Sequence, residues 1–119
     1  MKDDTPEPLN ERTKQFALEV IRCFVRLPHA EVARVLGRQL LRSRTSVGAH
    51  YREGHRAKSN ADFISKMEGA LQELEESCYW IELLAEGGGA SKEESIALLT
   101  EANELIAIFV SVVKNAKRR

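Results

Sequence analysis

The sequence is poor in residues that cross-link or break a chain. Its 119 residues include two cysteines, three prolines and seven glycines. Cys23 and Cys78 are too few for a disulfide scaffold, and their separation does not suit a zinc knuckle. No apolar run reaches 18 residues, and the first residues lack the apolar core of a secretory signal. We therefore expect no membrane contact and a cytoplasmic location.

Patterns that carry catalysis or bind metals are also missing. There is no Glu-x-x-His motif, no glycine-rich phosphate loop and no nucleophile elbow. The three histidines, His29, His50 and His55, do not share one face of a helix. Glu73 and Glu76 form a pair, but they point away from the apolar side of their segment. We expect no enzymatic activity, no metal and no cofactor.

The remaining pattern is helical throughout. The chain is 43% hydrophobic and 30% charged, and its apolar residues recur at steps of three and four. These steps predict helices over 10–27, 30–56, 59–86 and 91–116, after a flexible N-terminal arm at 1–9. Asn10 and Ser91 are candidate N-caps, whereas Pro28 and the glycines at 87–89 interrupt the pattern. We predict an all-α, antiparallel up-down-up-down four-helix bundle that forms a single domain over 10–117.

The net charge is zero, yet the charges are segregated along the chain. Residues 34–58 carry seven basic side chains and one acidic one, whereas residues 59–104 carry two basic and eleven acidic. In the helix at 30–56, the arginines fall opposite the apolar residues if the helix continues through Gly48. We call the predicted nucleic-acid-binding residues the basic stripe: Arg34, Arg38, Arg42, Arg44, Arg52, Arg56 and Lys58.

Three interpretations of the basic stripe stay open. It follows the phosphates of RNA or DNA, with an affinity that falls as salt rises. Alternatively it is a solvated face, or it pairs with the acidic helix at 59–86 of the same or a neighbouring subunit. Phosphate contacts do not read bases, and no aromatic residue is interleaved with the arginines. Any binding is therefore expected to have little sequence specificity.

Two features indicate contact between subunits. Trp80 lies outside the apolar face of its helix, on the side of Glu73 and Glu76, and aromatic residues are enriched at interfaces. The run 105–113 is apolar nearly all round, which is typical of a helix buried on more than one side. We predict Glu73, Glu76, Trp80 and Phe109 at the interface of a homo-oligomer.

Several runs resemble the bacterial 23S rRNA-intervening-sequence proteins. They are LGRQLLRS at 36–43 and TSVGAHYREG at 45–54, followed by FISK at 63–66, ALQE at 70–73 and Tyr79-Trp80. The resemblance covers about residues 10–119. It implies a bundle that assembles as a ring, most often a homopentamer, without catalytic residues. His50 stands where the family usually has Asn, and Arg44 stands where this branch often has Gly.

The resemblance also implies a nucleic-acid role, because some relatives are accessory proteins of retroelement reverse transcriptases with a basic surface that binds nucleic acid. We predict a non-enzymatic, oligomeric bundle that binds RNA or DNA phosphates through the basic stripe, which Arg44 is expected to strengthen. The alternative is a structural or protein-interaction module whose arginines form intersubunit salt bridges.

Overall fold

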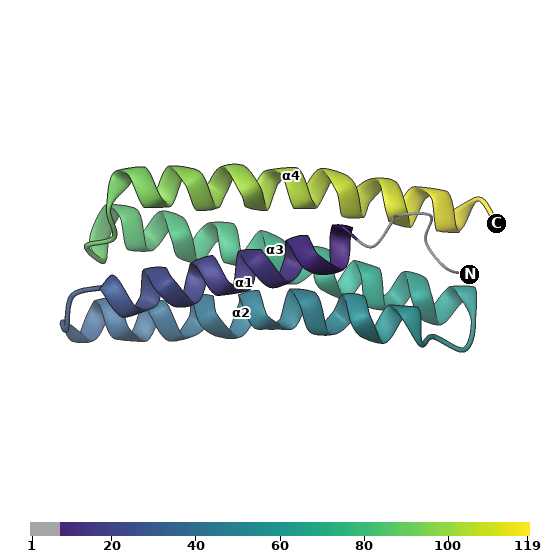
Figure 1. Ribbon diagram of the computed structural model, residues 1–119, viewed down its shortest axis with the longest axis horizontal. Helices are drawn as coiled ribbons and strands as arrows, with labels where there is room; N and C mark the ends of the chain where they lie inside the picture. Colours follow the sequence, from purple (N-terminus) through teal and green to yellow (C-terminus); the bar gives the residue numbers. More distant parts are fainter. Residues whose placement is uncertain (1–7) are drawn as a thin grey trace.

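A computed structural model describes residues 8–119 and consists of four helices. They are α1 (Pro8–Arg26), α2 (Glu31–His55), α3 (Asn60–Gly87) and α4 (Lys92–Lys117), and the described residues contain no strand. The helices lie side by side along a particle of 47 × 21 × 20 Å (Figure 1). The predicted all-α class with four helices is confirmed.

The helix bounds agree with the sequence expectation to within two residues. The arginines of the basic stripe were expected to fall opposite the apolar residues only if the helix continues through Gly48, and α2 does run unbroken through Gly48. The expected flexible arm is wrong for its last two residues, since α1 begins at Pro8 and Leu9 is buried. Proline suits the first position of a helix because the N–H that it lacks has no partner there. The rest of that arm lies outside the described residues.

The connections before and after α3 are short, and local hydrogen bonds and glycines define them. The hydroxyls of Ser59 and Ser91 accept hydrogen bonds from the backbone N–H groups of Asp62 and Glu94, both at 3.1 Å. These are N-caps that satisfy otherwise unpaired donors of the first turn. The glycines after α3 allow the chain to turn, because Gly89 adopts a positive φ of 82°.

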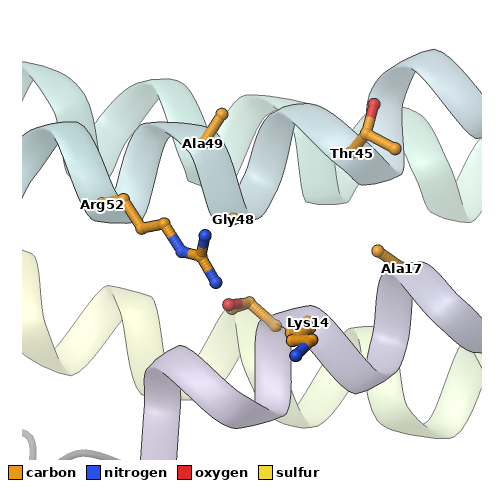
Figure 2. A pocket seen from close by; sticks show the side chains of 7 residues that line it. Lys14, Ala17, Thr45, Gly48, Ala49 and Arg52 are labelled. Atoms are coloured by element: carbon orange, nitrogen blue, oxygen red, sulfur yellow. The ribbon is translucent and has the colours of Figure 1, made fainter.

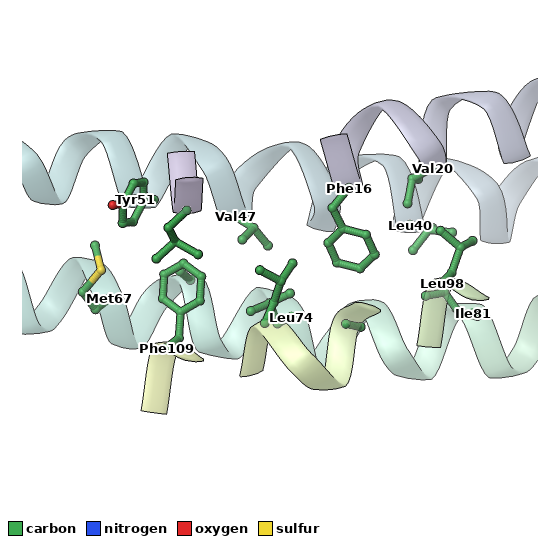
Figure 3. Packing of buried hydrophobic residues seen from close by; sticks show 14 of the residues in the cluster. Phe16, Val20, Leu40, Val47, Tyr51, Met67, Leu74, Ile81, Leu98 and Phe109 are labelled. Carbon is green, nitrogen blue, oxygen red and sulfur yellow. The ribbon is translucent and has the colours of Figure 1, made fainter. Parts of the chain in front are cut away.

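Apart from Ser43 and Val113, the buried residues of the helices follow alternating steps of four and three, the heptad pattern of interlocking helices. Side chains from all four helices meet in one core (Figure 3). The heptad positions are Leu9, Thr13, Phe16, Val20 and Cys23 in α1, continued by Leu27 just after it; Ala33, Gly37, Leu40, Arg44, Val47, Tyr51 and Gly54 in α2; Phe63, Met67, Ala70, Leu74, Ser77, Ile81 and Leu84 in α3; and Ser95, Leu98, Ala102, Leu105, Phe109, Val112 and Ala116 in α4.

Polar contacts join helices that are distant in sequence. Arg12 of α1 donates to both oxygens of Glu101 on α4, at 2.7 and 2.9 Å, and to Glu104 at 2.8 Å. Such two-pronged pairs fix orientation as well as adding energy. At the other end of α1, Arg26 pairs with Glu94 of α4. These contacts hold α1 to α4.

Among the described helices, α4 alone is long and apolar enough to cross a membrane by length and composition. No uninterrupted apolar run reaches 18 residues in this helix, because polar residues such as Glu101 and Glu104 interrupt it. In the structure the heptad residues of α4 pack in the common core, which accounts for part of its apolar content.

Candidate nucleic-acid interface

The basic stripe of α2 is divided by the heptad pattern into residues with different neighbours. Arg38 and Arg52 are fourteen residues apart, and Thr45 lies midway between them. Residues seven apart in a heptad helix share one line along its surface. Arg38 and Arg52 therefore lie on the same line of α2, one residue after the buried positions Gly37 and Tyr51.

Three members of the basic stripe are exposed and unneutralised. Arg38 lies at the surface of α2, Arg56 caps the C-terminus of α2, and Lys58 lies in the connection to α3. Within residues 8–119 none of the three makes a hydrogen bond or an ion pair with a carboxylate. Their charges are available to a ligand.

Two other arginines of the stripe turn toward α1 and meet uncharged groups. The guanidinium carbon of Arg34 lies 4.4 Å from the ring centroid of Phe24, a cation–π contact. Arg52 Nε donates to Asn10 Oδ1 at 3.1 Å. Arg52 is exposed, and its neutral partner orients the guanidinium without cancelling the charge.

Arg42 instead turns toward the acidic helix of its own subunit. Its guanidinium nitrogens lie 3.5 Å from Glu76 Oε1 and 3.9 Å from Glu73 Oε2. Burial, followed by the charge of Glu76, raises the pKa of Glu73, and Arg42 only partly opposes this shift. Pairing with α3 of the same subunit, one of the three open interpretations, thus applies to Arg42.

The placement of Arg44 on the nucleic-acid surface is wrong. Arg44 occupies a heptad position of α2 and has no exposed surface. Its guanidinium lies over the ring of Phe16, and its three side-chain nitrogens have no hydrogen-bond partner within the described chain. Burial lowers the pKa of Arg44 far below its usual value, despite opposing contributions from Cys78 and Glu101. Positions 37, 40, 44, 47 and 51 follow the heptad pattern, and this spacing alone predicts that residue 44 faces the core.

A groove between α1 and α2 adds a residue that the sequence analysis missed. The cavity has a volume of about 380 Å³, and Lys14 of α1 and Arg52 of α2 line it together with Ala17, Gly48 and Ala49 (Figure 2). Lys14 is exposed and has no carboxylate partner among the described residues. No sequence signal marks Lys14, because its meeting with Arg52 depends on how α1 docks.

The four predicted interface residues do not share one environment. The prediction that Phe109 lies at a subunit interface is wrong. Its ring is fully buried in the core of its own subunit, edge-on to the ring of Tyr51 with 5.9 Å between the ring centroids. Glu73 and Glu76 face Arg42 of α2. Trp80 is half-buried, and its Nε1 has no hydrogen-bond partner within residues 8–119.

An exposed aromatic residue beside Trp80 also escaped the sequence analysis. The side chain of Tyr79 is 55% exposed, and its ring centroid lies 5.3 Å from that of Trp80. The two rings present an aromatic surface on α3.

The acidic and histidine side chains form no metal-binding cluster in the described part of the chain. His50 Nδ1 lies 4.0 Å from Glu53 Oε1, and His55 packs edge-on against Tyr51 at 4.5 Å. His50 and His55 therefore have neighbours within their own helix.

Comparisons with known proteins agree on one family. The sequence model described as "23S rRNA-intervening sequence protein" matches residues 9–111. A crystal structure of a protein with unknown function from the S23 ribosomal protein family of Bacteroides thetaiotaomicron VPI-5482 is similar, with a TM-score of 0.83 and 32% sequence identity. The match covers 89% of this chain and 98% of that chain. No curated protein matches. With four helices and a match over most of its length, this chain belongs to the 23S rRNA-intervening sequence protein family.

Proposed function

We propose that the protein is a non-enzymatic binder of RNA or DNA that contacts phosphates through Arg38, Arg52, Arg56 and Lys58. One observation carries the proposal: these four cations lack a carboxylate partner among the described residues, whereas Arg12, Arg26 and Arg42 are all paired. A line of unneutralised cations attracts a polyanion and releases its counterions on binding.

The dimensions of α2 support contact with several phosphates at once. Arg38 and Arg56 are eighteen residues apart, which corresponds to about 27 Å along the helix. A duplex strand carries one phosphate about every 3.4 Å of its axis. The four cations can therefore contact several phosphates along one polynucleotide backbone, and phosphate contacts provide little base specificity.

The second candidate function is self-assembly as a structural or protein-interaction module. It is favoured by the exposed aromatic surface of Tyr79 and Trp80 and by Val32 and Val35 of α2, which are 58% and 46% exposed. Under this proposal, subunits with the up-down-up-down helix order form a cytoplasmic ring, most often a homopentamer, as the resemblance implies. The two functions are compatible, because a ring would multiply the basic surface.

The test is fluorescence anisotropy with labelled single- and double-stranded RNA and DNA across a potassium chloride series. We expect log K to fall linearly with log salt, with a slope that gives the number of phosphate contacts. Combined Arg38→Glu and Arg56→Glu substitutions should abolish binding without loss of helical circular dichroism. Combined Lys92→Glu and Lys114→Glu substitutions on α4 change the net charge equally and should bind more strongly than the α2 variant. An absence of binding at low salt would overturn the proposal and leave self-assembly as the function to pursue.

A further inference from the structure

We propose that the groove between α1 and α2 holds a phosphodiester group of the bound polynucleotide between Lys14 and Arg52. This inference rests on the proposed function and assigns a definite position to one of its phosphates. It adds α1 to a surface that the sequence analysis placed on α2 and the connection after it.

Two cations from different helices line the groove. Lys14 is supplied by α1 and Arg52 by α2, and Figure 2 shows the Arg52 side chain extending from α2 toward α1. Arg52 is oriented by the uncharged Asn10 Oδ1 at 3.1 Å, and among the described residues no carboxylate lines the groove. An anion placed between them would gain charge-assisted hydrogen bonds from both sides.

Small side chains keep the groove open. Ala17, Gly48 and Ala49 line it, and a Cβ atom at Gly48 would find Thr13 Oγ1 nearest, at 3.6 Å. The volume of about 380 Å³ lies at the lower end of the range for ligand cavities. A group larger than a single ion can therefore enter.

The hydroxyl groups in the groove do not compete with the cations for the ligand. Thr13 Oγ1 donates to the carbonyl of Asn10, and Thr45 Oγ1 donates to that of Leu41, both at 3.0 Å. Their protons are already used within their own helices. Attraction of the ligand therefore depends on Lys14 and Arg52.

Other grooves of this subunit have the opposite chemistry. The groove between α1 and α4 is lined by Glu19, Glu94 and Glu101, and a third, near the α3–α4 connection, is lined by Glu93, Glu94 and a single cation, Arg26, so that both grooves are acidic on balance. A polyanion would be repelled from both by like charge. The α1–α2 groove is favoured because it contains two cations and continues the line of Arg38 and Arg52.

The first experiment compares Lys14→Gln and Arg52→Gln with Lys92→Gln, an equal charge change at an exposed position of α4. The probe is a fluorescein-labelled single-stranded oligonucleotide, measured by anisotropy across a salt series. We expect each groove variant to weaken binding about tenfold and to reduce the salt slope by about 1. Lys92→Gln should bind like the natural chain.

A second pair of variants tests the groove by filling it without changing charge. Ala49 and Ala97 are both exposed helical alanines, in the α1–α2 and α1–α4 grooves respectively. Ala49→Trp should weaken oligonucleotide binding about tenfold, whereas Ala97→Trp should leave it unchanged. Circular dichroism and thermal melting verify that both variants remain folded.

The outcomes separate this inference from the proposed function. If the natural chain binds the oligonucleotide and the Lys14 and Ala49 variants bind equally well, the groove assignment is wrong and the proposed function stands. If no polynucleotide binds, the proposed function fails. Inorganic phosphate and a mononucleotide are then added in NMR titrations, and a response that Lys14→Gln abolishes would show a small-molecule anion site, which overturns the polynucleotide assignment.

Discussion

The guanidinium of Arg44 lies over the ring of Phe16 inside the bundle, where no described residue offers it a hydrogen bond. A cation over an aromatic face gains some electrostatic stabilisation. That gain is small beside the free-energy cost of removing a charge from water without a partner. Arg44 is therefore a destabilising residue at the contact between α1 and α2.

Replacing Arg44 with a residue that fits the core should stabilise the protein. We expect Arg44→Met to raise the free energy of unfolding by about 2 kcal/mol, because methionine fills the space without a charge. Urea denaturation followed by circular dichroism measures the change. Arg38→Met, at an exposed position of the same helix, is the control and should differ from the natural chain by less than about 0.5 kcal/mol. Destabilisation by Arg44→Met would show that the guanidinium has a partner in solution.

The raised pKa of Glu73 predicts a pH dependence of stability with a definite sign. A carboxyl whose pKa is higher in the folded than in the unfolded state binds more protons when folded, between the two pKa values. The free energy of unfolding should therefore fall as pH rises from the ordinary glutamate pKa through the raised one. Glu73→Gln should remove this contribution and leave the protein more stable at neutral pH.

Denaturation curves collected from acidic to neutral pH would measure this effect. Glu75→Gln is the matched control, because Glu75 is exposed on the same helix. Should Glu73→Gln show the same pH slope as the natural chain, the Glu73 carboxyl does not titrate as its burial implies.

The buried thiol of Cys23 should be inert toward alkylation. Burial, with the nearby Glu94, raises its pKa to about 12, so about 10⁻⁴ of it is thiolate at pH 8. Iodoacetamide at pH 8 should modify Cys23 only after unfolding, as followed by peptide mass spectrometry. The half-buried Cys78 also has a raised pKa and serves as the internal comparison. Rapid labelling of Cys23 in the folded protein would show that α1 opens frequently.

Trp80 provides a test of self-assembly. If its exposed part packs against a second subunit, Trp80→Ala should lower the particle mass measured by light scattering after size-exclusion chromatography. Ile96→Ala is a useful control, because Ile96 is an apolar residue of α4 that is 55% exposed and lies outside the proposed interface. An unchanged mass for Trp80→Ala would remove Trp80 from the proposed interface.

The sequence predicted the helices well because their boundaries depend on local chemistry. Pro28 marks the α1–α2 connection, and the glycines at 87–89 together with the cap at Ser91 mark the α3–α4 connection, because each of these signals acts over a few residues. The prediction for Arg44 was wrong because it rested on the charge of the residue and not on its position in the heptad pattern. Its heptad spacing from Leu40 and Val47 placed it inside the bundle.

The parts of the candidate site that escaped prediction depend on tertiary packing. Phe109 belongs to a run that is apolar nearly all round, so the sequence does not show which side of the helix faces the core. In the structure Phe109 is buried, and the next residue, Val110, is 39% exposed. Lys14 gains its place beside Arg52 only when α1 docks on α2 at Gly48. The turn of Arg42 toward Glu73 likewise needs the pairing of two helices.

One side chain at the start of α3 makes folding of that helix dependent on the far end of the chain. Asn60 Nδ2 donates to the backbone carbonyl of Ala116 at 2.7 Å, near the C-terminus of α4. This bond closes a loop of 56 residues, so it can form only after α4 has docked, and loop closure of that length is entropically unfavourable early in folding. Asn60→Ala should therefore accelerate unfolding while leaving the refolding rate almost unchanged, which would make docking of the α4 terminus one of the last events on the folding pathway.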